Sequence, residues 1–522
     1  MIGVLFLNDS AEAGRYVAAA IQRSVSAAQV RHISGGALDV ATDAIVAVDV
    51  PDSLGEPLLA WLRERPRKLI VLGRMPQALA GFVNLQAGEL PAGLHAASRS
   101  ESAPAYAWRE SGAAVQYTPL AQRLGGREWH RAFERFDFAD EWNNLGFGAI
   151  RADGSIWSVA GGAQVAPEAE LAAVRIDGER SFSYAALWDA GPSGVLWFNR
   201  AVGPCDSFEW RTVENFLSAY RASDLPCHPV LSEIPWGVDA AITSRLDCDE
   251  DVESARSLLQ AYQRMRVPFS LAVHTQNLSE PGHFPILREV LAEGGAVLSH
   301  TATHAPNWGG SYEAALREGI ESAALIEHAT GRRPRYAVSP FHQTPPYALQ
   351  ALADAGYAGC IGGIIRNDPE FVLARGGALA DLPAGFVGHS QQSMLHGECM
   401  LAQGDPLAVF KQAFDFALET RTLFGYLDHP FSRRYAYGWS DEVSRAVAHE
   451  QLIAYIRSRV ANPLFVDEET AMDFLRARSL TQIVLEGGAV RAWNPTGVTS
   501  PLTLGVELAG ERMPVELRTA TR

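Results

Sequence analysis

The sequence is poor in the residues that build disulfide frameworks or cysteine-bound metal sites. Five cysteines occur in 522 residues, an odd number, and no pair has C-x-x-C spacing. A disulfide-stabilised fold and a cysteine zinc site are therefore not expected. No apolar run approaches the ~20 residues of a membrane span. The first residues also lack the basic segment of a signal peptide, so we expect a cytoplasmic protein with no membrane span.

Basic residues are also scarce. Lys and Arg number 44 against 60 Asp and Glu, which gives a formal net charge of −16. Because phosphate binding requires clustered Lys and Arg, this balance argues against a nucleic-acid partner. No G-x-S-x-G elbow is present to indicate a serine nucleophile. Apolar content of 47% and charged content of 20% are typical of globular proteins, and the length suggests two to four domains.

The most informative feature is a pair of histidines four residues apart, His300 and His304, within Ser299-His300-Thr301-Ala302-Thr303-His304. If this segment is a helical turn, both imidazoles point the same way and can bind one divalent metal. Two histidines still need a third ligand, usually a carboxylate. Such a pair on its own is more often found on a helix surface or at a helix cap, so spacing alone does not establish a metal site.

Acidic residues and another histidine follow other predicted strands. Asp247-Cys248-Asp249-Glu250 comes after the apolar run Ala240-Ala241-Ile242, and Tyr426-Leu427-Asp428-His429-Pro430 closes another apolar segment. Separately, these motifs have ordinary explanations as a turn or helix N-cap and as a hydrogen-bonded core histidine. These two motifs and the histidine pair each lie at the carboxyl end of a predicted strand, where β/α barrels place their active sites. Their order therefore predicts a single site.

The ordered motifs resemble the polysaccharide deacetylase family, the NodB-homology carbohydrate esterases of family 4. The resemblance covers roughly residues 238–475. It implies that Asp247 is a general base, that His429 is a general acid and that Leu427 lines a pocket for the acetyl methyl group. It also implies a divalent metal, with zinc favoured and cobalt, nickel or iron as alternatives. The implied metal ligands are Asp249, His300 and His304.

The sequence departs from the family pattern at three motifs. Cys248 separates two aspartates that are adjacent in most members. The third motif, R-x-P-[YF] in the family, appears here as Val338-Ser339-Pro340-Phe341 without the arginine that normally orients the base. Another residue must therefore orient Asp247 and adjust its basicity. The fourth motif, D-x-x-D-W, has no clean match, and Asp381-Leu382-Pro383 is the nearest candidate.

These residue types permit hydrolysis without a covalent intermediate. A metal with three protein ligands keeps a position for water and lowers its pKa towards ~7. A carboxylate that does not bind the metal can take the proton of that water, and a protonated histidine can donate a proton to a leaving amine. This chemistry fits removal of N-acetyl groups from an amino-sugar poly- or oligosaccharide.

Further residues are candidates for substrate contact. One pair lies in a polar stretch flanked by glycines, which we interpret as a loop over the site or, with equal weight, as an ordinary hydrogen-bonded loop. Two more follow a predicted strand end. Two aromatic residues could stack on sugar rings, although aromatic side chains more often pack in cores. The histidines of the polar stretch are His389 and His396, the residues after the strand end are Phe341 and His342, and the two aromatic residues are Trp308 and Tyr435.

The chain is predicted to be an α/β protein with three parts. Residues 1–228 alternate strands and helices as in a doubly wound parallel sheet and resemble glutamine-amidotransferase-like and flavodoxin-like domains. The strand ending at Leu72 continues into Gly73-Arg74-Met75 without the cysteine of an active amidotransferase, so we interpret this domain as non-catalytic. Residues 229–478 repeat βα units, which the resemblance identifies with a distorted (β/α)7 barrel, and residues 479–522 predict a small β unit.

Two alternatives to the deacetylase remain open. One is an amidase of the same fold that acts on a small C–N substrate. The other is a carbohydrate-binding or assembly protein without turnover, which the missing arginine of the third motif favours. A homo-oligomer is compatible with the sequence in either case.

Overall fold

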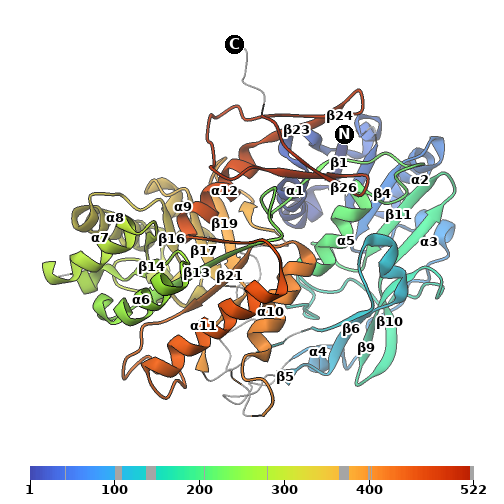
Figure 1. Ribbon diagram of the computed structural model, residues 1–522. Helices are drawn as coiled ribbons and strands as arrows, with labels where there is room; N and C mark the ends of the chain where they lie inside the picture. Colours follow the sequence, from blue (N-terminus) through green and yellow to red (C-terminus); the bar gives the residue numbers. More distant parts are fainter. Residues whose placement is uncertain are drawn as a thin grey trace.

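The computed structural model describes residues 1–41, 43–99, 109–133, 135–136, 149–204, 206–278, 280–363, 375–397, 400 and 403–517. Its two lobes lie side by side, and the C-terminal strands cross the region where they meet (Figure 1). Each lobe contains a large sheet with many parallel strands, one built from strands before residue 199 and the other from strands between residues 240 and 466. Within the described residues, no helix is both long and apolar enough to cross a bilayer.

The first sheet is mixed rather than wholly parallel. Five parallel strands occur in the order β2-β1-β3-β4-β11, as the alternating pattern predicts, and four antiparallel strands continue the sheet as β10-β9-β6-β7. Residues 155–159, which precede β9 in the chain, form only isolated bridges. The strand bounds are Ile2–Leu5 (β1), Val30–Ile33 (β2), Ala44–Val48 (β3), Lys68–Leu72 (β4), Ala113–Tyr117 (β6), Trp129–Ala132 (β7), Glu170–Ile176 (β9), Glu179–Ala190 (β10) and Ser193–Phe198 (β11).

Helices cover both faces of this sheet. Successive side chains of a buried strand point to opposite faces, so each strand supplies two cores. Residues of α1 (Ala11–Val25) and α5 (Ser207–Ser218) join one core, whereas α2 (Gly55–Glu64) and α3 (Gln77–Val83) join the other. Helices therefore pack on both faces of the parallel strands.

The second sheet carries the predicted catalytic motifs. Its parallel strands lie in the order β19-β17-β16-β15-β14-β13-β21-β20, with β22 also paired to β13 and the short β18 antiparallel to β19. No closed barrel forms among the described strands, since the ladder ends at β18 and β20. The bounds are Ala240–Cys248 (β13), Ser270–Val273 (β14), Ala296–Ser299 (β15), Tyr336–Val338 (β16), Gly359–Gly363 (β17), Gly377–Ala378 (β18), Val387–Gln391 (β19), Ser393–Met394 (β20), Phe424–Asp428 (β21) and Pro463–Val466 (β22).

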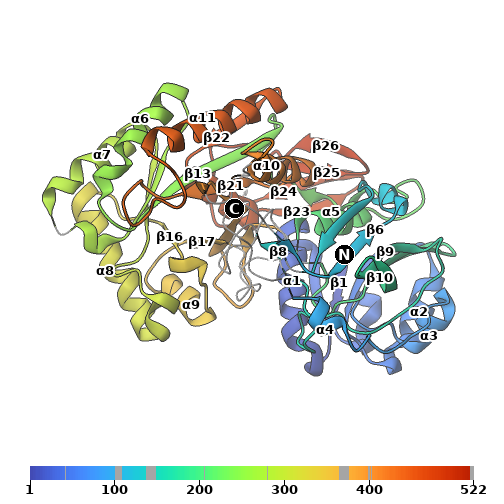
Figure 2. The same ribbon diagram turned by 90° about the horizontal axis from the view of Figure 1, so that it is seen from below.

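Helices pack against the outer face of this sheet (Figure 2). On β13, Leu246 and Cys248 face outward and share a core with α6 and α7. Alternation along the strand therefore turns Arg245, Asp247 and the following Asp249 to the inner face. The helices are α6 (Arg256–Met265), α7 (Phe284–Ala292), α8 (Tyr312–Thr330), α9 (Pro346–Asp354), α10 (Ala408–Thr420), α11 (Glu442–Arg459) and α12 (Glu468–Leu480).

The C-terminal strands form two hairpins and do not stand alone. β23 (Gln482–Glu486) pairs with β24 (Ala489–Trp493), and β25 (Gly505–Leu508) pairs with β26 (Glu511–Pro514). β25 also pairs with β12 (Val230–Leu231), which precedes the second sheet. Ile483 and Val506 are fully buried in a core that includes strands of the second sheet.

Polar contacts also join the two lobes. The backbone N–H of Ile483 donates to Ser26 Oγ of the first lobe at 3.0 Å. The buried Arg375, which precedes β18, lies 2.8 Å from a carboxylate oxygen of Glu214 on α5 and 3.8 Å from one of Glu233. Buried ion pairs and the shared C-terminal strands thus hold the lobes in one arrangement.

Candidate metal centre

The three motifs identified in the sequence meet at one end of the second sheet. Asp247 lies in β13 and Asp249 directly follows it, His300 follows β15, and His429 follows β21. These strands are near neighbours in the order β15-β14-β13-β21 and run parallel, so their carboxyl ends are at the same edge. Three segments separated by up to 180 residues are thereby placed together, which is the usual location of sites in α/β folds.

Asp249, His300 and His304 form a group suited to a metal ion. One ligand atom from each residue lies within 4.8 Å of the others. Asp249 Oδ1 is 3.3 Å from His300 Nε2 and 3.5 Å from His304 Nε2, and the two Nε2 atoms are 3.1 Å apart. Two nitrogens and one carboxylate oxygen are a donor set that suits zinc and its neighbours.

The histidine pair does not lie on a helical turn, contrary to the sequence prediction. Residues 300–304 form a loop after β15, and both Thr301 and His304 have left-handed backbone conformations, with φ of 65° and 54°. Thr301 Oγ1 accepts a hydrogen bond from the His304 backbone N–H at 3.0 Å. Glu318 of α8 accepts from the backbone N–H groups of Ala302 and Thr303 at 2.8 Å each. The loop is therefore fixed from within and from a neighbouring helix.

Hydrogen bonding and burial prepare these side chains to bind a cation. His300 Nδ1 is 3.1 Å from the Val338 carbonyl oxygen, so Nδ1 carries the proton and Nε2 keeps its lone pair towards the group. Burial and the adjacent His300 lower the pKa of His304 to about 3, which keeps His304 neutral. Asp249 Oδ1 is buried with no hydrogen-bond partner among the described residues. A divalent cation would satisfy all three groups.

Asp247 is held by an arginine from its own strand. Arg245 Nε donates to Asp247 Oδ1 at 2.6 Å, and Arg245 Nη2 donates to Asp247 Oδ2 at 3.2 Å. Residues two apart in a strand share a face, so both side chains project inward. Burial acts to raise the pKa of Asp247, but the Arg245 guanidinium outweighs it and lowers the pKa to about 2. Asp247 is therefore ionised at neutral pH.

Arg245 contacts the aspartate that the missing arginine of the third motif was expected to orient, and sequence reasoning overlooked it. The available signal was a basic residue inside a buried strand, two positions before an aspartate. Such a residue is rare unless it is paired.

His429 faces the same group from the opposite side. Its Nε2 lies 3.8 Å from Asp249 Oδ2, and its ring stacks on Tyr435 with centroids 5.4 Å apart and planes at 16°. The backbone N–H of His429 donates to Asp428 Oδ1 at 2.8 Å, and its carbonyl accepts from Arg445. Backbone and ring are thus both held.

A buried polar chain lies behind His429. Asp428 Oδ2 is 3.1 Å from His449 Nε2, and His449 Nδ1 is 2.8 Å from the hydroxyl of Tyr262. Asp428 faces outward from β21 towards His449 of α11, which leaves Leu427 and His429 on the inner face. Leu427 is fully buried and pairs in register with Arg245.

Two of the substrate candidates lie next to the metal group, and one is buried nearby. Phe341 is 43% exposed, and its ring lies 4.5 Å from that of His304. Tyr435 is half-buried and stacks on His429 as described above. His342 is buried, and burial lowers its pKa to about 3, so it is a neutral side chain in the interior.

The other three candidates lie in the interior, and the predicted loop at residues 388–397 is wrong over most of its length, because β19 and β20 occupy residues 388–391 and 393–394. His389 belongs to β19, is buried, and its Nε2 is 3.2 Å from the Leu423 carbonyl oxygen. His396 is fully buried beside the ring of Tyr437. Trp308 is 1% exposed, and its indole N–H donates to the Gln343 carbonyl at 2.8 Å. Packing leaves no free ring face on Trp308 for a sugar, so its predicted stacking role is corrected to a core role.

The candidate for the fourth motif is also elsewhere. Asp381 is exposed and pairs with Arg15 of α1 at 3.1 Å. It therefore contacts the first lobe and not His429.

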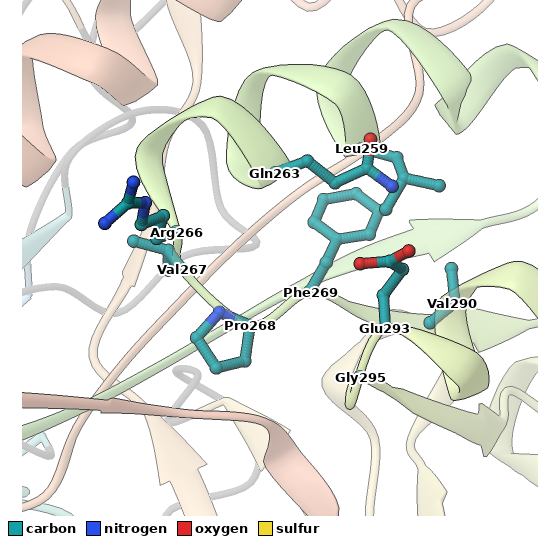
Figure 3. A pocket seen from close by; sticks show the side chains of 9 residues that line it. All are labelled: Leu259, Gln263, Arg266, Val267, Pro268, Phe269, Val290, Glu293 and Gly295. Carbon is teal, nitrogen blue, oxygen red and sulfur yellow. The ribbon is translucent and has the colours of Figure 1, made fainter.

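A separate pocket of about 330 Å³ lies at the opposite end of the strands (Figure 3). Its lining comes from α6, α7 and the segment before β14, and it contains one acidic residue, Glu293, and one basic residue, Arg266. No group of metal-binding or paired catalytic side chains lines it, so it does not compete as a reaction site.

Residues 247–360 match the polysaccharide deacetylase family. This range begins at Asp247 and includes Asp249, His300 and His304. No match to a curated protein was found.

Several solved structures resemble part of the chain weakly. A family 4 acetyl xylan esterase from Clostridium thermocellum, in complex with a cobalt ion, is 13% identical over 45% of this chain and 91% of its own, with a TM-score of 0.30. Peptidoglycan deacetylase PdaC from Bacillus subtilis is 11% identical over 45% and 91%, with a TM-score of 0.28. PuuE allantoinase is 13% identical over 46% and 91%, with a TM-score of 0.36. These similarities are too low to assign an activity.

Proposed function

We propose that this chain is a metal-dependent hydrolase that removes N-acetyl groups from an amino-sugar poly- or oligosaccharide. The observation that carries the proposal is the different environment of two nearby aspartates. Asp249 faces two imidazole nitrogens, whereas Asp247 is paired with a guanidinium. One carboxylate is thus placed to bind a cation and the other to act as a base, within a polysaccharide deacetylase domain.

Asp249, His300 and His304 would hold the metal, with zinc favoured by the donor set and cobalt, nickel or iron as alternatives. When bound, a divalent metal supplies a more acidic water and polarises the acetyl carbonyl. These three side chains fix the position of that chemistry at the carboxyl ends of β13 and β15. The buried loop around Thr301 holds the two imidazoles in place without substrate.

Asp247 would accept the proton of the attacking water. A base must be ionised, and its pKa of about 2 keeps Asp247 ionised throughout the neutral range. The bidentate contact with Arg245 also fixes the carboxylate plane, which limits the orientations that a proton acceptor can adopt. A low pKa makes Asp247 a weak base, so its contribution depends on position more than on intrinsic basicity.

His429 would donate a proton to the leaving amine. Expulsion of an amine from an amide requires this proton, because an amine anion is a very poor leaving group. The ring of Tyr435 keeps the His429 imidazole in one plane. Asp428 and Arg445 hydrogen-bond to the His429 backbone and fix this residue at the end of β21.

Substrate would approach from the exposed side of this group. Phe341 and Tyr435 are partly exposed aromatic residues beside the metal ligands and His429, and we propose them as surfaces for a sugar ring. Leu427 and His342 would lie behind them, with Leu427 as a wall of the acetyl-methyl pocket. Residues 1–228 are proposed as a non-catalytic accessory domain.

Acetate release tests the proposal. Zinc- or cobalt-loaded protein should release acetate from N-acetylglucosamine or N-acetylgalactosamine oligomers, and metal-free protein should not. A small cyclic ureide or amide serves as the comparison substrate. Turnover of that compound alone would replace the deacetylase by an amidase of the same fold, and no turnover of any substrate by metal-loaded protein would leave a carbohydrate-binding protein.

A further inference from the structure

A second buried carboxylate, Glu468, lies beside Arg245 on the side away from Asp247. Glu468 is the first residue of α12 and is 1% exposed at its side chain. One of its oxygens, Oε1, lies 3.6 Å from Arg245 Nη1 and accepts a hydrogen bond from Gln391 of β19. Its backbone N–H donates to Ser270 Oγ of β14 at 3.0 Å. Residues of β13, β14 and β19 therefore all contact Glu468 at the start of α12.

Strand pairing places Glu468 level with Arg245. β22 runs parallel to β13, with Thr243 in register with Val466. Arg245 and Glu468 each lie two residues after this pair, so the strand register places the two residues at the same level of the sheet. Because α12 begins as β22 ends, the position of Glu468 is set by the sheet and not by a free loop.

The guanidinium divides its donors between the two carboxylates. Nε and Nη2 of Arg245 both donate to Asp247, and Nη1 points to Glu468. Without a second contact, the guanidinium could turn at the end of the long Arg245 side chain and keep only one of its two hydrogen bonds to Asp247. The Glu468 carboxylate, 3.6 Å from Nη1, forms an ion pair without a hydrogen bond and favours one orientation of the guanidinium plane, which determines whether both oxygens of Asp247 are held.

We propose that Glu468 is a positioning residue of the reaction, acting through Arg245 to hold the Asp247 carboxylate in a single orientation. This inference rests on the proposed function in one respect, the assignment of Asp247 as the base. Within the described residues, Glu468 forms no hydrogen bond or ion pair with Asp247 or with the metal-binding group, so its influence passes through the guanidinium. Small displacements of a base cost large factors in rate, which gives an indirect anchor a measurable effect.

A double-mutant cycle tests the proposal. Burial outweighs Arg245 and raises the pKa of Glu468 to about 7, so kcat is measured above pH 8, where the carboxylate is ionised. Glu468→Gln keeps the size and a hydrogen-bonding side chain but removes the negative charge, and at that pH it should lower kcat about 10-fold with KM and bound metal unchanged. Arg245→Gln should lower kcat about 100-fold, and the double variant should lose no more than Arg245→Gln alone. Glu468→Asp should recover part of the loss. Additive losses, or wild-type kcat in Glu468→Gln, would overturn the proposal.

Glu469→Gln is the matched control. Glu469 is the next residue of α12, but it pairs with Arg332 and Arg335 at the surface. Its variant should keep the wild-type kcat, which separates an effect on the site from a general effect on the start of α12.

A crystal structure of Glu468→Gln gives a result that does not depend on turnover. The inference predicts that the bidentate contact of Arg245 with Asp247 becomes a single bond or is lost. An unchanged contact would overturn it. If the wild-type protein released no acetate, the proposed function would fail, and this structure would still decide whether Glu468 positions Asp247.

Discussion

At the scale of single residues, function depends on the partner that each carboxylate meets. Asp247 and Asp249 are two positions apart and project to the same face, yet one meets a guanidinium and the other two imidazoles. The sequence assigned these roles through the order of the motifs. It could not identify Arg245 as the partner of Asp247, because the family places this arginine on a different strand.

The pH dependence of turnover should reveal the Arg245 contact. In Arg245→Gln the charge that opposes burial is lost, so the pKa of Asp247 should rise from about 2. The base is then protonated at a higher pH, and the acidic limb of the kcat/KM profile should move upward in pH. Profiles of the wild-type and variant proteins between pH 4 and 9 check this, and an unchanged acidic limb would contradict it.

Metal binding should depend strongly on His304. His304→Ala removes one of three ligands, and we expect bound zinc at equilibrium with micromolar metal to fall at least 10-fold. Elemental analysis after dialysis measures this. His328→Ala, which removes an exposed histidine of α8, is the control and should retain the wild-type content. Equal metal content in both variants would exclude His304 from the site.

At the scale of elements, the strands were easier to predict than the turns. β15 begins and ends where the apolar run predicts, at Ala296–Ser299, because hydrophobic runs in buried parallel strands are distinctive. The conformation of residues 300–304 was mispredicted, since spacing of four residues brings two side chains together in a helical turn and also in this left-handed loop. Spacing thus predicted the proximity of the histidines but not the backbone that produces it.

Polar strands and short elements were missed for a related reason. β19 contains His389, Ser390 and Gln391, all buried, and reads as a loop. Its polar side chains are stable in the interior because they meet other polar groups, such as Gln391 with Glu468. Hydropathy cannot distinguish such a strand from a surface loop. β22 and α12, which bring Glu468 to the site, were not predicted either.

The left-handed loop should depend on the Thr301 hydroxyl. Thr301→Val keeps the shape of the side chain but removes the acceptor for the His304 N–H, at a cost of about 1 kcal/mol in the free energy of unfolding. The orientation of His304 should loosen, and zinc affinity should fall several-fold. Competition with a chromogenic chelator measures the affinity, and an unchanged Kd would show that the loop does not need this bond.

At the scale of the whole molecule, the two lobes behave as parts of one structure. Arg375 of the second lobe pairs with Glu214 of the first, and both are buried. In the C-terminal hairpins, β25 pairs with β12, and the backbone of β23 hydrogen-bonds to Ser26 of the first lobe. The sequence indicated where the βα patterns stop and restart, but contacts between residues more than a hundred positions apart leave no local pattern to detect.

Breaking the buried pair should destabilise the whole chain. Glu214→Ala leaves the Arg375 charge buried with fewer partners, which typically costs about 3–5 kcal/mol in the free energy of unfolding. Burial raises the pKa of Glu214, but Arg375 outweighs it and lowers the pKa to about 2, so the pair stabilises the fold above the unfolded-state pKa of 4.5 and is lost as the pH falls towards 2.

Thermal unfolding at pH 7 measures this effect. The Tm of Glu214→Ala should fall by several degrees relative to wild type, and the gap should narrow as the pH falls from about 4.5. An exposed-site variant such as Glu419→Ala, whose partner Arg127 is half-exposed, should shift Tm far less. Equal shifts in the two variants would mean that the buried pair does not hold the lobes together.

The most direct test of the account pairs two measurements on one variant, Asp247→Asn. The substitution keeps the shape of the side chain and leaves Asp249, His300 and His304 untouched. The account predicts wild-type zinc content together with a loss of about 10²–10⁴-fold in acetate release from N-acetylated amino-sugar oligomers. Loss of zinc in this variant, or acetate release at the wild-type rate, would contradict the separation of base and ligand on which the account rests.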